Sequence, residues 1–69
     1  MLTQIITTAA AIAYVNAIEA QWYGAAKPIL FAAPELVNGW DDCPGIAVHT
    51  SENRWSVWVE RDGSIYGEC

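Results

Sequence analysis

The sequence contains one histidine and two cysteines, side chains that often serve proteins as bases and nucleophiles. His49 and Cys43 lie near each other in the chain, so one interpretation is a general base that activates a thiol. No catalytic signature surrounds them, and no third residue is evident that would orient them. A chain of 69 residues also has little room for a water-excluding pocket of about 300 Å³ or more. We therefore predict that the protein is not an enzyme and that His49 forms local hydrogen bonds in a strand.

Several side chains have atoms that can bind a metal ion, but their spacing does not fit a metal site. They are Asp41, Asp42, Cys43, His49 and Cys69. Structural zinc sites bring paired ligands about two to four residues apart. The Asp41-Asp42 pair also lacks the alternating acids, central glycine and terminal glutamate of a calcium loop. We expect no metal and no other cofactor, and we expect these two acids in a solvated turn unless a partner covers them.

The two cysteines leave two interpretations open. Cys43 and Cys69 either form a disulfide that closes the second half of the chain, or remain thiols, one buried and one at a frayed terminus. Two cysteines are too few for the disulfide framework of a small secreted protein, which favours thiols and a cytosolic location. The apolar segment 5–15 has no Lys or Arg before it and is interrupted by Thr7 and Thr8, unlike a signal peptide. We therefore predict a soluble, cytosolic protein.

Acidic residues and tryptophans are interleaved in the second half of the chain. The formal net charge of −5 arises in residues 35–69, which hold seven acids and two bases. Such a charge repels nucleic acids and anionic membranes, whereas carboxylates attract a basic protein and aromatic side chains supply much of the energy at interfaces. We predict a protein partner with a basic surface, and no direct binding to nucleic acid or membrane. The predicted partner-binding residues are Glu35, Trp40, Asp41, Asp42, Glu52, Trp58, Glu60 and Asp62.

A helix is predicted over residues 9–23, because apolar side chains recur there at three- and four-residue spacing. Thr8 is the predicted N-cap and Gly24 the predicted end of this helix. The apolar stripe consists of Ile12, Val15, Ile18 and Trp22. Residues 2–7 are rich in β-branched side chains and run directly into an alanine-rich segment, so we leave open whether they form strand or helix.

The middle of the chain is divided by prolines. Residues 29–33 form a short apolar run that fits either a strand or a buried connector. Pro34 and Glu35 are both typical of a helix N-terminus, so we predict a helix of one or two turns through Val37. Residues 40–45 combine two acids, a proline and a glycine and therefore predict a turn.

An antiparallel meander is predicted for the last third of the chain. Its strands are 46–50, 54–60 and 64–66, joined by turns at 51–53 and 62–63. Alternation in the middle strand places Trp55, Val57 and Val59 on one face, which we expect to pack on the helix. Trp58 then lies on the opposite face, beside Glu60. Two interpretations of Trp58 stay open: an exposed indole that marks a binding surface, or a core side chain covered by residues 28–40.

These elements together predict a single domain, residues 1–69, of the α+β class. One main helix packs on a three- or four-stranded antiparallel sheet, because two layers are the simplest way to bury both apolar faces. A chain this short buries only ~60% of the surface that its unfolded form exposes. Its core must therefore be dense, and 54% apolar residues including four tryptophans make that possible.

The overall profile resembles the small phage-encoded inhibitors of bacterial defence, in particular anti-CRISPR proteins, which are very short, acidic and without catalytic motifs. The resemblance covers the whole chain in size, charge and element order, and it transfers no individual residue. It implies a stoichiometric inhibitor in the cytoplasm of a bacterial host that blocks a nucleic-acid-binding surface of its target. The alternative is a homo-oligomeric structural or adaptor module. Its contact would be the alanine-rich helix face formed by Ala9, Ala10, Ala13, Ala17 and Ala20.

Overall fold

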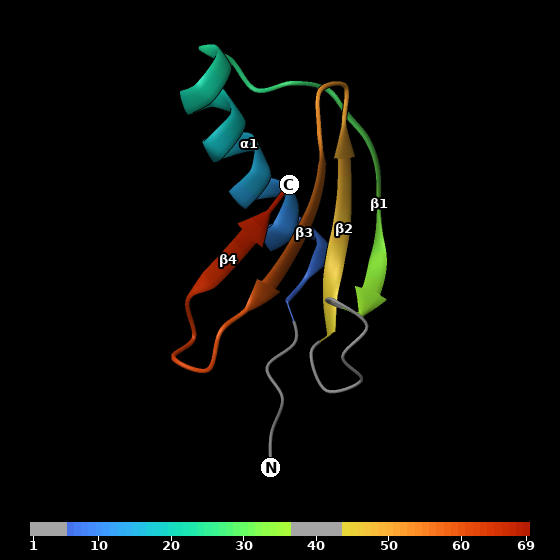
Figure 1. Cartoon of the computed structure of the whole chain (residues 1–69), viewed down its shortest axis with the longest axis vertical. Coiled ribbons are helices and arrows are strands. Elements are labelled where there is room, and N and C mark those ends of the chain that lie inside the picture. The colour runs from blue at the N-terminus through green and yellow to red at the C-terminus, as the bar shows by residue number, and fades with distance from the viewer. Residues whose placement is uncertain (1–5, 37–43) are drawn as a thin grey trace.

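A helix packs against one face of a four-stranded antiparallel sheet in the computed structural model, which describes residues 6–36 and 44–69 (Figure 1). The elements are α1 (Thr8–Tyr23), β1 (Ile29–Leu36), β2 (Pro44–Thr50), β3 (Arg54–Val59) and β4 (Ile65–Glu68). The strands lie side by side in chain order, so β1 and β4 are the edges of the sheet. The predicted α+β class is confirmed, with four strands.

The helix begins one residue earlier than predicted. Thr7 is the N-cap: its backbone is extended and its hydroxyl oxygen accepts a hydrogen bond from the amide of Ala10 at 3.1 Å. Thr8, the predicted cap, is already helical. Gly24 ends the helix in the left-handed conformation with φ 81°, as predicted, because a residue without Cβ adopts that conformation at low cost.

Removal of the Thr7 cap tests this boundary. We expect Thr7→Ala to lower the free energy of unfolding by about 1 kcal/mol, because the amide of Ala10 loses its acceptor. Thr8→Ala is the matched control and is expected to change stability by less than about 0.5 kcal/mol. Urea denaturation measures both. Equal losses in the two variants would contradict the assignment of the cap.

The predicted short helix at Pro34 is wrong. Pro34 and Glu35 lie within β1, where they pair with Ile46 and Gly45 of β2. A proline is tolerated in an edge strand at a position where the backbone N–H would face solvent, because no sheet hydrogen bond is then lost. The sequence signals of a helix start do not distinguish this case. The run 29–33 is therefore the first part of a strand. Residues 37–43, which include most of the predicted turn 40–45, lie outside the described residues. The last two residues of that predicted turn, Pro44 and Gly45, are part of β2 and not of a turn.

The predicted meander is confirmed with small shifts of its ends. β2 already begins at Pro44, β3 ends at Val59, and β4 extends to Glu68. The β2–β3 turn occupies residues 51–53, as expected, and the β3–β4 turn places Gly63 at φ 90°. Figure 1 shows the β2–β3 turn at the same end of the molecule as the C-terminal end of α1, with the β3–β4 turn at the other end.

The core lies between α1 and the sheet. The helix buries Ala11, Val15 and Glu19. The sheet contributes the fully buried Val48, Trp55 and Val57, so the predicted inward face of β3 is correct. Trp22 is 55% exposed, which corrects its place in the predicted stripe. Because α1 is apolar almost all round, the spacing of its apolar residues does not single out the buried face.

Within the described parts of the chain, no helix is long and apolar enough to span a lipid bilayer.

Candidate functional site

One face of the sheet is free of α1 and carries aromatic and charged side chains. Strand pairing determines its composition: Trp58 lies opposite Tyr66, Ser56 opposite Glu68, and His49 opposite both Phe31 and Arg54. Side chains that are directly opposite on neighbouring strands share a face of the sheet. We call the following set the open sheet face. It consists of Phe31, Glu35, His49, Arg54, Ser56, Trp58, Tyr66 and Glu68.

Glu35 of β1 contacts two residues of β3 across the intervening strand β2 on the open sheet face. Its Oε1 accepts a hydrogen bond from Nη2 of Arg54 at 3.3 Å, and its Oε2 accepts one from the hydroxyl of Ser56. The Arg54 side chain is 64% exposed, so water screens the ion pair and it contributes roughly 0–1 kcal/mol. These contacts mainly fix the orientation of the Glu35 carboxylate. The predicted site residue Glu35 therefore has a defined position on this face.

The indole of Trp58 is packed and not exposed. Its ring meets that of Tyr66 edge to face at 5.1 Å between centroids, and its Nε1 donates to Oε2 of Glu60 at 2.6 Å. Only 9% of Trp58 is exposed, against 48% of Tyr66. The interpretation of Trp58 as a bare indole is therefore wrong, although strand alternation gave its face correctly. Trp58 is instead one of the buried core residues, as the alternative interpretation expected. Cover by residues 28–40 stays a prediction, because residues 29–36 form the edge strand β1 and residues 37–40 lie outside the described residues.

Tyr66 and Phe31 were not expected at the site, and Glu68 was one of the acids interleaved with tryptophans but not a predicted partner-binding residue. Phe31 is 53% exposed and packs edge to face against the His49 ring at 4.9 Å. Glu68 is exposed at the end of β4. Alternation along a strand shows which residues share a face, but it shows that these residues lie on the open sheet face only once the pairing register is known. The predicted third strand also ended at residue 66, before Glu68. The edge-to-face contact with Phe31 also gives the position of His49, whose ring packs against this phenyl ring on the open sheet face.

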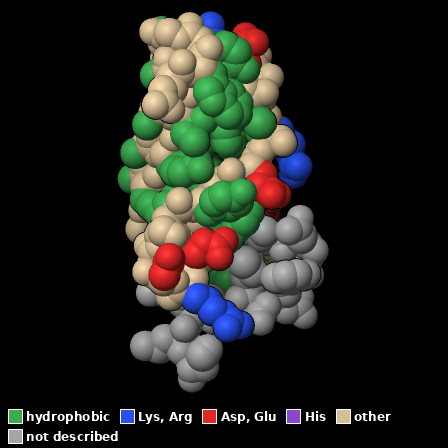
Figure 2. Space-filling view, turned by 60° about the vertical axis from the view of Figure 1, so that its left-hand side comes forward, with side chains coloured by type: hydrophobic (Ala, Val, Ile, Leu, Met, Phe, Trp, Pro, Cys, Tyr) green, Lys and Arg blue, Asp and Glu red, His purple; other side chains and the backbone are tan. Residues whose placement is uncertain are grey.

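The predicted acids do not form one cluster. Glu60 and Asp62 lie at the β3–β4 end of the sheet, near Trp58, whereas Glu52 lies in the β2–β3 turn at the opposite end (Figure 1). Asp62 caps its own turn: hydrogen bonds from the Ser64 hydroxyl and amide lower the pKa of Asp62 below its ordinary value. Trp40, Asp41 and Asp42 lie outside the described residues. Figure 2 shows apolar side chains running down one side of the molecule, with acidic side chains toward their lower end.

A second group of interacting residues surrounds Glu19, which the sequence analysis treated only as a charge. This carboxylate is fully buried in the core, and its Oε2 accepts three hydrogen bonds. The donors are the hydroxyl of Thr50 at 2.9 Å, Nδ2 of Asn53 at 3.0 Å and Nε1 of Trp55 at 2.8 Å. Among the described residues, Oε1 of Glu19 accepts no hydrogen bond. A charged residue within an apolar helix indicates that Glu19 could have buried polar partners. This pattern does not show which residues those partners are, because they are distant in the sequence.

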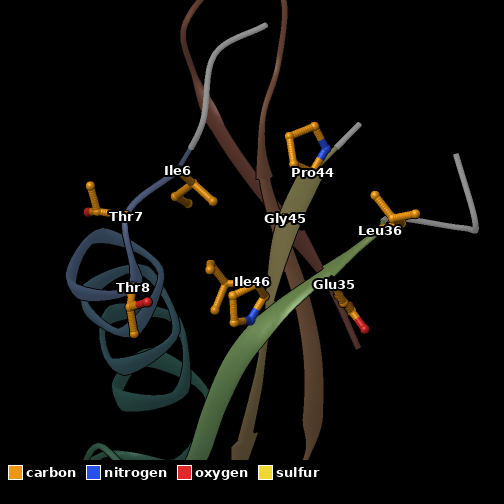
Figure 3. Close-up of a pocket in the computed structure, with 9 residues that line it drawn as sticks. Ile6, Thr7, Thr8, Glu35, Leu36, Pro44, Gly45 and Ile46 are labelled. Carbon is orange, nitrogen blue, oxygen red and sulfur yellow. The ribbon is translucent and has the colours of Figure 1, made fainter. Parts of the chain in front are cut away.

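A cavity of about 620 Å³ lies where the start of α1 meets the end of β1 and the start of β2 (Figure 3). Its lining is mainly apolar and includes Ile6, Leu36, Pro44 and Ile46. Figure 3 shows the Glu35 side chain pointing away from the cavity. The other polar lining residues are Thr7, whose hydroxyl already caps α1, and Thr8. The polar side chains of the described lining thus come from the start of α1 and the end of β1.

The cysteines and the alanine-rich helix face complete the predicted features. Cys69 is an exposed free thiol, whereas Cys43 lies outside the described residues. No three metal-binding side chains lie close together in the part of the chain that the structure describes. The helix exposes Ala9, Ala13 and Ala17, while Ala10 and Ala20 are half-buried.

No protein-family model matches the chain, and neither the curated proteins nor the solved structures gave a match. The resemblance to phage-encoded inhibitors therefore stays a prediction based on the overall profile.

Proposed function

We propose that the protein is a non-catalytic binding module that engages a basic surface of a protein partner through the open sheet face. The observation that carries the proposal is the pairing register. It gathers the exposed rings of Phe31 and Tyr66 and the carboxylates of Glu35 and Glu68 on the face that α1 leaves free. Glu60 joins this surface through its hydrogen bond to Trp58.

The proposed surface combines two kinds of interaction. Large exposed rings on a rigid sheet lose little conformational entropy on binding and supply contact area, as aromatic residues do at many interfaces. Carboxylates around them attract lysine and arginine side chains over about a Debye length and orient the encounter. The packed Trp58 supports Tyr66 from one side, so the exposed tyrosine ring is held in place before a partner arrives.

A stoichiometric inhibitor is the specific role that we propose for this module. A partner groove that binds nucleic acid is lined with lysine and arginine, and a carboxylate-bearing face occupies the same groove without chemistry. The formal net charge of −5 supports this role, because the protein itself is repelled by nucleic acid. The resemblance to anti-CRISPR proteins points in the same direction.

Charge reversal on the open sheet face tests the proposal. Tagged protein is used to capture a partner from a bacterial lysate at low salt, and binding of the purified partner is then measured by calorimetry. We expect Glu68→Lys to weaken binding about tenfold at low salt, because an attraction of roughly 0.5–1 kcal/mol becomes a repulsion of similar size. The salt dependence of binding should also become flatter.

Glu52→Lys is the matched control. It makes the same change of charge on an exposed residue of the β2–β3 turn, outside the open sheet face, so it alters the net charge equally without changing that face. We expect it to reduce affinity much less than Glu68→Lys. Equal losses in the two variants would show that only net charge matters, and unchanged binding in both would rule out electrostatic recognition.

A further inference from the structure

The buried Glu19 carboxylate connects two segments that are distant in sequence. Glu19 lies in the C-terminal half of α1, and its three hydrogen-bond donors lie at the end of β2, in the β2–β3 turn and at the start of β3. A fourth link comes from Nδ2 of Asn53, which also donates to the hydroxyl of Tyr23 at 2.9 Å. The helix end is thus joined to one sheet turn by polar contacts that extend from the buried Glu19 carboxylate to the exposed Tyr23 hydroxyl.

The Thr50 hydroxyl connects the Glu19 carboxylate to the β2–β3 turn, so its hydrogen bonds depend on whether the carboxylate is ionised. Its oxygen accepts hydrogen bonds from the amides of Glu52 at 3.1 Å and Asn53 at 3.0 Å. Its single proton has two acceptors within reach, Oε2 of Glu19 at 2.9 Å and the carbonyl of Asn53 at 3.4 Å. Loss of charge on Glu19 makes the carboxylate a weaker acceptor, which favours the local carbonyl and breaks the link to α1.

Few other charged or titratable groups among the described residues face Glu19. On the helix side they are the Tyr23 hydroxyl and Lys27, whose ammonium lies 5.3 Å from the centre of the Tyr23 ring. The groups that β2 and β3 direct at Glu19 are neutral donors, and Arg54 and His49 lie on the opposite face of the sheet. The residues that pack against the core from β1 and β4, such as Ile29, Ala32 and Gly67, carry no charge.

We propose that Glu19 is an acid-sensitive latch: when ionised it holds the C-terminal end of α1 against the β2–β3 turn, and when protonated it releases that end while the sheet persists. The geometry supports a local release, because the latch contacts are confined to one end of the molecule. The β3–β4 turn has its own hydrogen bonds at the other end, from the amide of Glu60 to the carbonyl of Ser64 and from the amide of Gly63 to the carbonyl of Glu60. This inference is independent of the proposed binding function.

The direction of the pH response follows from the surroundings of the carboxylate. Burial raises the pKa of Glu19, but hydrogen bonds from Asn53, Trp55 and Thr50, together with the charge of Lys27, outweigh burial and lower it below its ordinary value of 4.5. The unfolded or released state therefore binds the proton more readily than the latched state. The stabilisation by the latch is complete above pH 4.5 and is lost as the pH falls through the lowered pKa.

The test is an NMR titration of the full chain from pH 7 to acid. It records the Glu19 side-chain carboxyl carbon, the Trp55 indole N–H and the hydrogen-exchange protection of backbone amides. We expect the indole signal to shift with the same midpoint as the carboxyl carbon. Protection of the amides at the C-terminal end of α1, such as those of Trp22 and Tyr23, should fall at least tenfold through that midpoint, because the latch holds this end. Protection of the β3 amide of Val57 should change less than twofold.

Three variants make the result decisive. Glu19→Gln is expected to show the released pattern already at pH 7, and Glu35→Gln, which removes a carboxylate on the opposite face, to behave like the unchanged protein. Asn53→Ala keeps the Glu19 carboxylate but removes a donor, so the midpoint of Glu19 should rise. The latch is refuted if Glu19→Gln retains the pH response of Trp55, or if all amides lose protection together. Should Glu19→Gln fail to fold, an unchanged Glu19 midpoint in Asn53→Ala refutes it.

Discussion

Replacement of Glu19 by leucine is expected to lower the free energy of unfolding at pH 7 by about 3 kcal/mol. The substitution leaves three donors without their acceptor, among them the indole N–H of the almost fully buried Trp55. Each unsatisfied buried donor costs roughly 1–3 kcal/mol. Part of the summed cost of the three donors is offset, because the variant no longer has to desolvate an ionised carboxylate on folding. Urea denaturation with a tryptophan fluorescence readout measures the change.

Glu52→Leu provides the control for this prediction. It removes one carboxylate in the same way, but from an exposed position in the β2–β3 turn, and we expect a change of less than about 0.5 kcal/mol. A Glu19→Leu variant that is as stable as the unchanged protein would contradict the account, because it would show that Thr50, Asn53 and Trp55 find other acceptors at no cost.

The second large effect is expected at Gly67, where Gly67→Ala should cost about 2 kcal/mol. A Cβ at this position would lie 2.7 Å from Cε1 of Tyr14, so the tyrosine ring would have to move. That ring is held by the hydrogen bond from the Gly67 amide to its hydroxyl at 3.1 Å and by an edge-to-face contact with Trp55 at 6.4 Å. Its displacement therefore disturbs the helix–sheet contact beside the core.

A double-mutant cycle separates this collision from a general preference for glycine. Tyr14→Leu removes the ring atom that the new methyl group would meet, so Gly67→Ala should cost at least 1 kcal/mol less in that background than in the unchanged protein. Thermal or urea denaturation of the four proteins gives the coupling. If the two losses simply add, the close approach of Tyr14 is not the reason that position 67 holds glycine.

The sequence predicted elements best where one strong local pattern acted alone. Alternation in β3 placed Trp55 and Trp58 on opposite faces correctly, and Gly24 marked the helix end through its left-handed backbone. Pro34 was misassigned because proline suits both a helix start and an edge strand, and only the pairing with Ile46 decides between them.

The candidate site was less accessible to sequence reasoning because it depends on contacts between distant segments. Glu35 and Glu52 look equivalent in the sequence, yet β-sheet pairing places Glu35 on the open sheet face and Glu52 in a turn at one end of the sheet. Tyr66 becomes a candidate only because it lies opposite Trp58. Glu19 appeared as an isolated charge, and its role follows from partners more than 30 residues away in the chain.

The most direct test of the binding proposal is to map the contact surface by NMR, with isotope-labelled protein and the purified partner. We predict that backbone signals of Phe31, Tyr66 and Glu68 shift or broaden on addition of the partner, and that signals on the exposed side of α1 do not. Changes confined to Ala9, Ala13 and Ala17, with the open sheet face unaffected, would contradict the proposal and would favour recognition through the alanine-rich side of the helix.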